Sequence, residues 1–246
     1  MFTGKFALPF ERVHDKVGWT SLFQRYWYHS ITVSLLYYVF VRLLQRLMRD
    51  RQPFQLRVPL IVWNFVLAIF SFAGLVRFSE CILFVIRAIR TVSLLFAFSK
   101  IVEFGDTLFI VLRKRKLIFL HYYHHAAVFV YTIHSGTEHT APGQAFISMN
   151  FLAHSAMYSY YTAKSCGIKV PRPIAMAVTS IQTAQMFLGV AVSTLVLKLK
   201  LLDGYRCQQS WANLILAFTI YATFALLFVR FFVDAYLHRN RKQKEK

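Results

Sequence analysis

The chain has 246 residues, of which 57% are hydrophobic and only 16% are charged. A soluble domain carries about 25% charged residues and cannot hide this much apolar surface, so the composition excludes a sizeable soluble domain. The net charge of +19 comes from short basic runs between apolar stretches. Such runs are typical of loops that face anionic lipid and argue against a nucleic-acid partner. We therefore expect a single membrane domain over residues 1–246.

Seven stretches approach the roughly 20 apolar residues that a helix needs to cross a bilayer. The segment 1–25 precedes them, and its mixed residues lack the apolar core of a cleavable signal peptide. In chain order, we expect helices at 27–47, 58–77, 82–112, 117–136, 144–165, 174–197 and 212–237, and a basic tail at 238–246. Arg87 and Arg90 interrupt the third stretch, which is either one helix or a short lead-in followed by a spanning helix from Thr91.

The distribution of basic residues predicts the orientation of these helices. Four basic regions lie at 46–57, 113–116, 164–172 and the C-terminus. The connection 134–143 has no Lys or Arg, so we expect it in the lumen, with a lumenal N-terminus and a cytosolic C-terminus. Three basic residues do not fit this orientation, because it puts them on the lumenal side: Lys198, Lys200 and Arg206. The tail from Lys242 to Lys246 has the dilysine form K-x-K-x-x, a retrieval signal of the endoplasmic reticulum.

Polar residues follow helical spacing on four consecutive predicted helices. The stripes are Lys100, Glu103, Asp106 and Thr107; His121, His124 and His125; Asn150, His154, Met157, Tyr158 and Tyr161; and Thr179, Gln182 and Gln185. Ionisable groups inside membrane helices are costly and usually face an interior cavity, so we expect the stripes to converge on one site.

Some of these residues have a simpler structural interpretation. Buried Asn, Gln or Thr side chains often only link helices by hydrogen bonds, and Lys100 with Glu103 fits a structural ion pair. Three histidines within five residues of an apolar helix have no such use in packing. The cluster His121, His124 and His125 therefore indicates a functional site.

The four stripes resemble motifs of the ELO family of fatty-acid elongases. Lys100 to Thr107 is similar to K-x-x-E-x-x-D-T, His121 to His125 to H-x-x-H-H, Asn150 to Tyr161 to N-x-x-x-H-x-x-M-Y-x-Y-Y, and Thr179 to Gln185 to T-x-x-Q-x-x-Q. All four occur in the family's order, and the resemblance covers residue 27 to the end. The motif sequences H-Y-Y-H-H and M-Y-S-Y-Y most resemble those of family members that act on saturated and monounsaturated acyl chains.

This resemblance implies a 3-ketoacyl-CoA synthase of the endoplasmic reticulum, which condenses acyl-CoA with malonyl-CoA and releases CO2 and CoA. It implies an all-α membrane fold in which six of seven transmembrane helices form a barrel around an acyl tunnel. No cofactor is expected beyond the two CoA substrates. The pathway implies a ketoacyl reductase, a dehydratase and an enoyl reductase as partners, and a homodimer is compatible with the sequence.

The resemblance also assigns roles within the site. His124 would carry the acyl group as an acyl-imidazole, flanked by His121 and His125. A cysteine nucleophile is not expected, because all three cysteines lie outside the polar stripes. The remaining catalytic candidates are His154, which would polarise the thioester carbonyl or protonate the enolate, and Glu103 and Asp106, which would orient the histidines.

The predicted substrate-binding residues fall into two groups. Lys100, Asn150, Tyr158, Gln182 and Gln185 lie within the helices, and Arg113, Lys116, Tyr161, Lys164 and Arg172 lie at the cytosolic mouth. The basic residues of the second group either hold CoA phosphates or only set the membrane orientation. At the lumenal face, Cys81 and Cys207 are placed to form a disulfide.

Two other classes of protein share some of these features. A membrane di-iron desaturase or hydroxylase also carries H-x-x-H-H, but it needs several histidine boxes to fill two metal sites. A transporter or receptor would use buried histidines as a proton relay, and would not explain four motifs in order. We therefore expect no metal ligands.

Overall fold

The computed structural model describes residues 16–84, 89–202 and 208–238, and every regular element in these ranges is helical. The α-helices are α1 (Lys16–Tyr26), α2 (His29–Leu47), α3 (Arg57–Phe84), α4 (Ile89–Val102), α5 (Gly105–Leu112), α6 (Phe119–Glu138), α7 (Gly143–Ser165), α8 (Arg172–Leu201) and α9 (Trp211–Phe232). A short π-helix, η2 (Val233–His238), follows. The prediction of an all-helical chain is confirmed.

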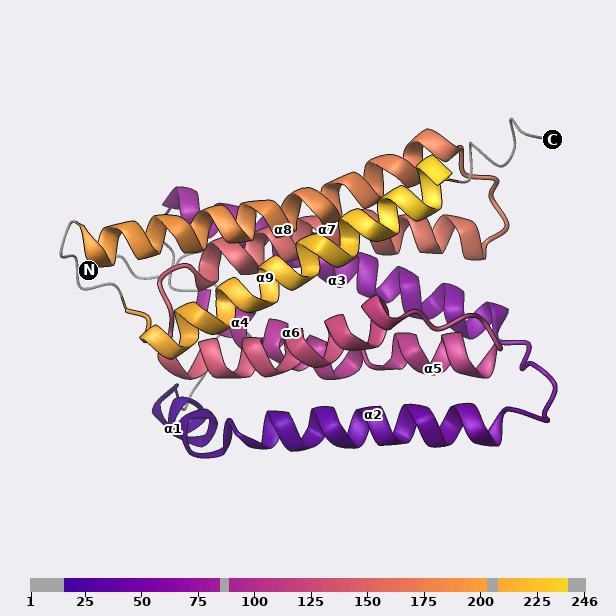
Figure 1. The fold of residues 1–246 in the computed structure, drawn as a ribbon, viewed down its shortest axis with the longest axis horizontal. Coiled ribbons are helices and arrows are strands. Elements are labelled where there is room, and N and C mark those ends of the chain that lie inside the picture. Colours follow the sequence, from indigo (N-terminus) through magenta and orange to yellow (C-terminus); the bar gives the residue numbers. More distant parts are fainter. Residues whose placement is uncertain (1–15, 85–88, 203–207, 239–246) are drawn as a thin grey trace.

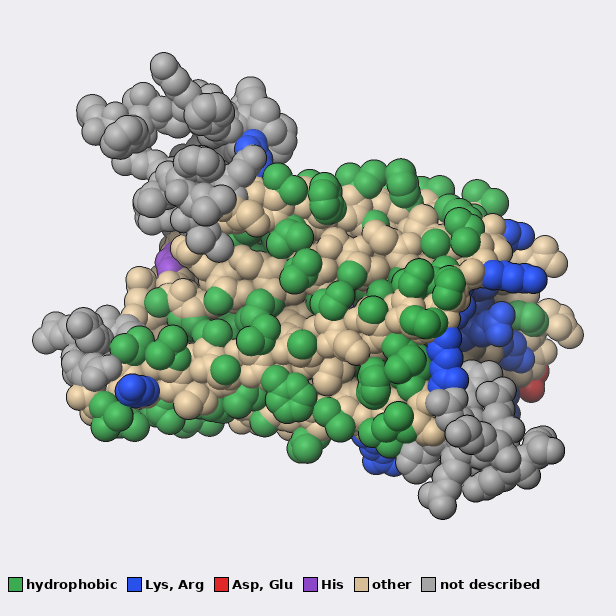
Figure 2. Space-filling model, turned by 90° about the horizontal axis from the view of Figure 1, so that it is seen from above, with side chains coloured by type: hydrophobic (Ala, Val, Ile, Leu, Met, Phe, Trp, Pro, Cys, Tyr) green, Lys and Arg blue, Asp and Glu red, His purple; other side chains and the backbone are tan. Residues whose placement is uncertain are grey.

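The helices are suited to a lipid environment. Within the described ranges, three helical stretches are long and apolar enough to cross a membrane: Arg57–Ser79, Arg172–Leu201 and Trp211–Leu237. Large apolar side chains cover the outside of the bundle, including Leu35, which is 63% exposed, and Leu226, which is 73% exposed. Figure 2 shows hydrophobic side chains along the length of the molecule and Lys and Arg side chains gathered mainly at one end. This surface matches a protein that lies in a bilayer.

The N-terminal segment contains a helix in addition to the predicted ones. This helix, α1, begins at Lys16 and packs against α6. In Figure 1, α1 lies across one end of the bundle, while the long helices run roughly along the same axis. Closely packed pairs are α3 with α7, α8 with α9, and α2 with α6.

The third predicted helix, 82–112, is not continuous. It corresponds to the end of α3, then α4, and then α5 after a break at Glu103 and Phe104. Around this break the backbone N–H groups of Phe104, Asp106 and Thr107 donate to carbonyls three residues earlier, at 3.1, 3.1 and 3.2 Å. Such i→i−3 bonds tighten the turn and rotate the helix face that follows.

Gly105 lies at this break because a neighbouring helix comes very close to it. A Cβ atom on Gly105 would lie 2.5 Å from the indole ring of Trp63 on α3, so no larger residue fits without a shift. The break is therefore shaped by tertiary contact with α3 and not only by the local sequence.

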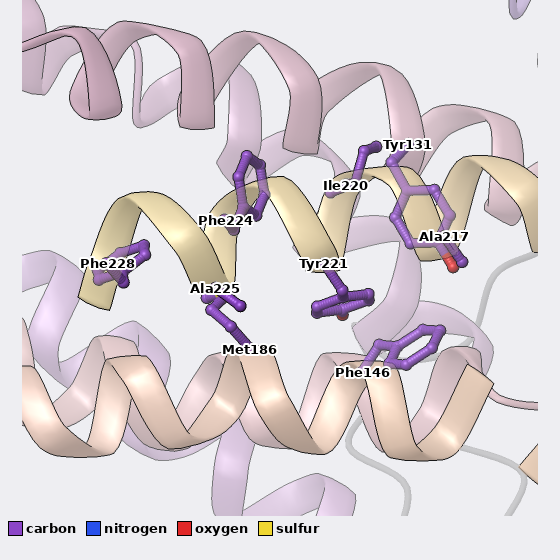
Figure 3. Packing of buried hydrophobic residues seen from close by; sticks show 9 residues of the cluster. All are labelled: Tyr131, Phe146, Met186, Ala217, Ile220, Tyr221, Phe224, Ala225 and Phe228. Carbon is purple, nitrogen blue, oxygen red and sulfur yellow. The ribbon is translucent and has the colours of Figure 1, made fainter. Parts of the chain in front are cut away.

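The largest buried apolar cluster lies where α6, α7, α8 and α9 meet (Figure 3). Its labelled residues are Tyr131, Phe146, Met186, Ala217, Ile220, Tyr221, Phe224, Ala225 and Phe228. The Tyr221 ring packs directly over Gly189 of α8, where an added Cβ would lie only 2.2 Å from the ring. This glycine lets α8 and α9 approach closely.

Gly189→Ala should therefore destabilise the bundle by about 1–3 kcal/mol, the usual cost of overpacking. The measurement is thermal unfolding of the protein in detergent, with Gly136→Ala as the matched control. An added Cβ at Gly136 meets nothing within 4 Å. Alanine also favours the helix over glycine, so the control should melt at or above the wild-type temperature. Equal melting temperatures for the two variants would contradict the packing argument.

Candidate active site

Lys100 and Glu103 form a buried ion pair that links α4 to α7. Nζ of Lys100 donates to Oε1 of Glu103 at 2.8 Å and to Oδ1 of Asn150 at 2.8 Å. The hydroxyl of Ser99 donates to the same carboxylate oxygen at 3.2 Å. Nζ also lies 4.3 Å from the ring centroid of Phe96. Since Lys100 is 3% and Glu103 5% exposed, these contacts replace almost all their contact with solvent.

Asp106 follows the break before α5 and makes hydrogen bonds of its own. Its Oδ1 accepts a hydrogen bond from the indole N–H of Trp63 at 2.6 Å, and its Oδ2 accepts one from the Tyr158 hydroxyl at 2.7 Å. The carboxylate thereby ties α5 to α3 and α7. We expected Asp106 to orient a histidine, whereas its hydrogen bonds go to these two aromatic side chains.

The residue after Asp106 makes the contact with the histidine box. Oγ1 of Thr107 lies 3.0 Å from Nε2 of His121 and 2.6 Å from the hydroxyl of Tyr37 on α2. The His121 and His125 rings pack with their centroids 4.5 Å apart. The first and third histidines of the box are therefore held from the α5 side.

His124 contacts both its neighbour in the box and α9, since its ring centroid also lies 5.8 Å from that of His125. Its ring packs against Phe224 and Phe228 of α9, with centroid distances of 4.6 and 5.9 Å. Its Nδ1 is buried and has no hydrogen-bond partner among the described residues. An imidazole nitrogen left without a partner is available to a bound reactant.

His154 on α7 lies close to the buried ion pair. Its Nδ1 is 3.8 Å from Oε2 of Glu103, too long for a hydrogen bond but close enough for electrostatic attraction. This nitrogen is also buried and unpartnered among the described residues. The Glu103 carboxylate is thus close enough to attract a positive charge on this imidazole, although the same carboxylate is already paired with Lys100.

A cavity of about 340 Å³ runs beside these helices. His124, Asn150 and Gln185 contribute to its lining, together with apolar side chains of α4, α6, α8 and α9. Its wall continues past Tyr131 to His139, directly after the end of α6. As far as the described residues define it, His121, His125 and His154 lie outside this lining.

The other predicted binding residues lie in two places. Gln182 donates to Sδ of Met157 at 3.1 Å, and Gln185 is buried at the cavity wall. Residues expected at the cytosolic mouth lie at helix ends: Arg113 after α5, Lys116 before α6, Tyr161 and Lys164 in the last turn of α7, and Arg172 at the start of α8. Lys164 donates to the hydroxyl of Tyr160 at 3.2 Å, and Arg172 donates to the carbonyl of Tyr236 at 2.6 Å.

Neither a metal site nor the predicted disulfide is defined by the described residues. No group of three or more His, Cys, Asp or Glu side chains in the described ranges could hold a metal ion. The predicted pair Cys81 and Cys207 lies outside the residues whose side chains are described. Cys166 is a free, exposed thiol at the end of α7, remote from the histidine box in the sequence.

Three aromatic contacts to the site were missed by the sequence analysis. Trp63 and Tyr37 bind the polar residues of α5, and Phe224 packs on His124. All three lie in apolar helices that are rich in aromatic residues, so no local pattern distinguishes them from lipid-facing side chains. The N-terminal aromatic residues Trp19 and Phe23 also line the cavity, although segment 1–25 was assigned no role.

These features describe a helical, multi-pass membrane protein with a histidine beside a mostly apolar cavity. The ELO family model, described as the GNS1/SUR4 family, matches residues 22–244. The chain therefore belongs to the ELO family.

Named relatives agree with this family. The chain is 50% identical to "Putative fatty acid elongase 4" of Caenorhabditis elegans, over 98% of this chain and 88% of the relative. It is 38% identical to very long chain fatty acid elongase 3 of Homo sapiens, over 91% and 88%. It is also 40% identical to very long chain fatty acid elongase 6 of Drosophila melanogaster, over 80% and 70%.

The buried ion pair gives a test of how the site is held. Lys100→Met leaves the Glu103 carboxylate buried without its counter-charge and should lower the unfolding free energy by about 3–5 kcal/mol. The double variant Lys100→Met/Glu103→Leu should be clearly more stable than the single one, since no isolated charge remains. Unfolding in detergent measures both, and a double variant no more stable than the single one would contradict a direct pair.

Proposed function

We propose that this protein is a 3-ketoacyl-CoA synthase, which joins an acyl-CoA to malonyl-CoA and lengthens the acyl chain by two carbons. The observation that carries the proposal is the place of His124. Its imidazole lines a long, mostly apolar cavity, and its Nδ1 has no partner among the described residues. Family membership and the names of its relatives support the same reaction class.

In the first half-reaction, a nitrogen of His124 attacks the thioester carbonyl of acyl-CoA. The C–S bond breaks, CoA leaves as a thiol with the proton of the imidazole, and an acyl-imidazole forms. The acyl tail lies in the apolar cavity, where its burial contributes binding energy. This assignment needs no thiol nucleophile, in accord with the exposed position of Cys166 at a helix end.

In the second half-reaction, malonyl-CoA loses CO2 and its enolate attacks the carbonyl carbon of the acyl-imidazole. The new C–C bond forms as the C–N bond to His124 breaks, and the ring regains a proton. The sum is acyl-CoA, malonyl-CoA and one proton giving 3-ketoacyl-CoA, CO2 and CoA. We expect no cofactor in this cycle.

In this scheme, His154 and the ion pair beside it interact with the charge that develops on the thioester carbonyl and on the enolate. We assign His154 the polarisation of the thioester carbonyl or the protonation of the enolate. We assign the Glu103 carboxylate, 3.8 Å from its Nδ1, the role of orienting this imidazole. Asn150 and Gln185 line the same cavity as His124, and we assign them the donation of hydrogen bonds to carbonyl oxygens.

The membrane arrangement that goes with this function is also a proposal. We propose seven spanning segments, formed by α2, α3, α4 with α5, α6, α7, α8 and α9, with six of them around the cavity and α2 outside. Figure 2 supports a single cytosolic end, because the Lys and Arg side chains gather where α5, α7 and α9 end and α8 begins. We therefore propose a lumenal N-terminus and a cytosolic C-terminus, as the sequence predicts.

We propose the endoplasmic reticulum as the location, on the basis of the dilysine tail, which lies outside the described residues. A ketoacyl reductase, a dehydratase and an enoyl reductase would complete the elongation cycle. Their reactions follow from the chemistry of the product, since a 3-ketoacyl-CoA must be reduced, dehydrated and reduced again. A homodimer remains compatible with the exposed apolar faces. The desaturase alternative is not favoured, because the family of the chain is that of the elongases.

His124→Ala should abolish condensation, because the proposed acyl carrier is lost. The assay incubates purified protein in detergent with labelled malonyl-CoA and a panel of saturated acyl-CoAs, and follows 3-ketoacyl-CoA. Mass spectrometry of wild-type protein given acyl-CoA alone should find the acyl group on the peptide with His124. The matched control is His29→Ala, a histidine at the start of α2 whose ring stacks on Tyr26, away from the cavity lining.

Product formation by His124→Ala at the wild-type rate would contradict the acyl-imidazole. Absence of product from the wild type with every acyl-CoA, saturated or unsaturated, would contradict the condensing function itself. Iron content and substrate transport would then be the next measurements, since they distinguish the desaturase and transporter alternatives.

Lys116→Ala tests whether basic residues at the cytosolic end of the cavity hold the phosphates of CoA. Lys116 is exposed just before α6. Loss of an exposed charge pair costs ~0.2–1 kcal/mol, which corresponds to a rise of about one and a half to fivefold in KM for acyl-CoA. The rise should shrink at high salt, while kcat stays unchanged. The matched control is Lys198→Ala, an exposed lysine near the opposite end of α8. An equal KM change in both variants would show that these charges act only through net charge.

A further inference from the structure

The end of the cavity farthest from His124 is partly built by the N-terminal helix. Trp19, Thr20 and Phe23 of α1 line the cavity there, beside Gly136 and His139 at the end of α6. Trp19 and Phe23 are four residues apart and therefore lie on one face of α1. Figure 1 shows α1 lying across this end of the bundle.

Specific contacts hold α1 in this place. Nε2 of Gln24 donates to the backbone carbonyl of Thr137 at 3.1 Å, and Oγ1 of Thr20 lies 3.2 Å from Nε2 of His139. Trp19 packs edge-on against Phe98 of α4 at a centroid distance of 5.9 Å. The helix is thus tied to both α4 and α6, the two walls between which the cavity ends.

The position of this wall suits the end of a long acyl chain. Gly136 lies 12 residues after His124 on the same helix, which corresponds to about 18 Å at the rise of an α-helix. The reactive carbonyl and the methyl end of one extended chain would therefore lie at opposite ends of the cavity. Aromatic side chains at its far end would limit how many methylene groups fit.

We infer that α1, through Trp19 and Phe23, forms the wall that sets the longest acyl chain the enzyme accepts. The inference rests on the proposed condensing function, and it adds a specificity-determining role for a segment outside the four polar motifs. Its physical basis is burial: a chain that is two carbons too long cannot bury its last two methylene groups. Burial of two methylene groups is worth roughly a factor of ten in affinity.

Gly136 offers the opposite change at the same end. It lines the cavity, and an added Cβ there meets nothing within 4 Å. Because Gly136 belongs to the cavity lining, we expect a larger side chain at this position to fill part of the α1 end and shorten the cavity. Enlarging and shortening substitutions at one end should therefore shift the chain-length profile in opposite directions.

The experiment measures kcat/KM for condensation with saturated acyl-CoAs that increase by two carbons. Trp19→Ala should raise kcat/KM about tenfold for the first acyl-CoA beyond the wild-type limit, and Gly136→Leu should lower it about tenfold for the longest good substrate. Both should leave short chains unchanged, because these do not reach the wall. The matched control is Leu22→Ala, which removes an exposed apolar side chain of α1 that does not line the cavity.

Each outcome separates this inference from the proposed function. An unchanged profile in Trp19→Ala and Gly136→Leu, with normal activity on short chains, overturns the role of α1 but leaves the condensing function standing. A Leu22→Ala profile that shifts as far as that of Trp19→Ala also overturns it, since any loosening of α1 would then suffice. Should Trp19→Ala fail to fold, Phe23→Leu and Gly136→Leu give the same test. No product from the wild type overturns both proposals.

Discussion

The ion pair between Lys100 and Glu103 is the constraint on which the centre of this bundle depends. Both side chains are almost fully buried, and an isolated charge in such a place would cost several kcal/mol. Each charge is therefore balanced by the other and by a hydrogen bond from Ser99 or to Asn150. Because Asn150 belongs to α7, the hydrogen bond that compensates the Lys100 charge also fixes how α4 and α7 pack. Glu103 is held within 3.8 Å of His154 by the same network.

The break after α4 explains how one short segment serves several helices. A continuous helix would point Glu103, Asp106 and Thr107 along one stripe, toward a single neighbour. The tightened turn instead directs Glu103 toward α7, Asp106 toward Trp63 and Tyr158, and Thr107 toward Tyr37 and His121. Four helices are thus joined to α4 and α5 by polar contacts. Hydrogen bonds of this kind align helices in lipid, where the hydrophobic effect cannot drive them together.

The sequence predicts the helical fold and singles out the buried polar residues, but it does not predict the partners of these residues. Buried charges and clustered histidines are conspicuous in apolar helices, so Lys100, Glu103 and His124 could be chosen without a structure. Trp63 could not, because an indole facing lipid and an indole donating to a carboxylate have the same sequence context. The break at Glu103 depends on the approach of Trp63 to Gly105, and the place of α1 depends on α4 and α6. These contacts are tertiary, so the spacing of apolar residues along the sequence cannot predict them.

The arrangement of polarity along the bundle connects the site to its surroundings. Basic side chains gather at one end, the buried polar network occupies the middle, and the cavity continues from His124 toward the opposite end. A molecule with an anionic head and a long apolar tail would have complementary surroundings in only one direction along this axis. Its junction between head and tail, which in a thioester is the reactive carbonyl, would then lie beside the histidines. The buried charges at the centre thus hold the helices together at the depth where the proposed function requires the reaction to occur.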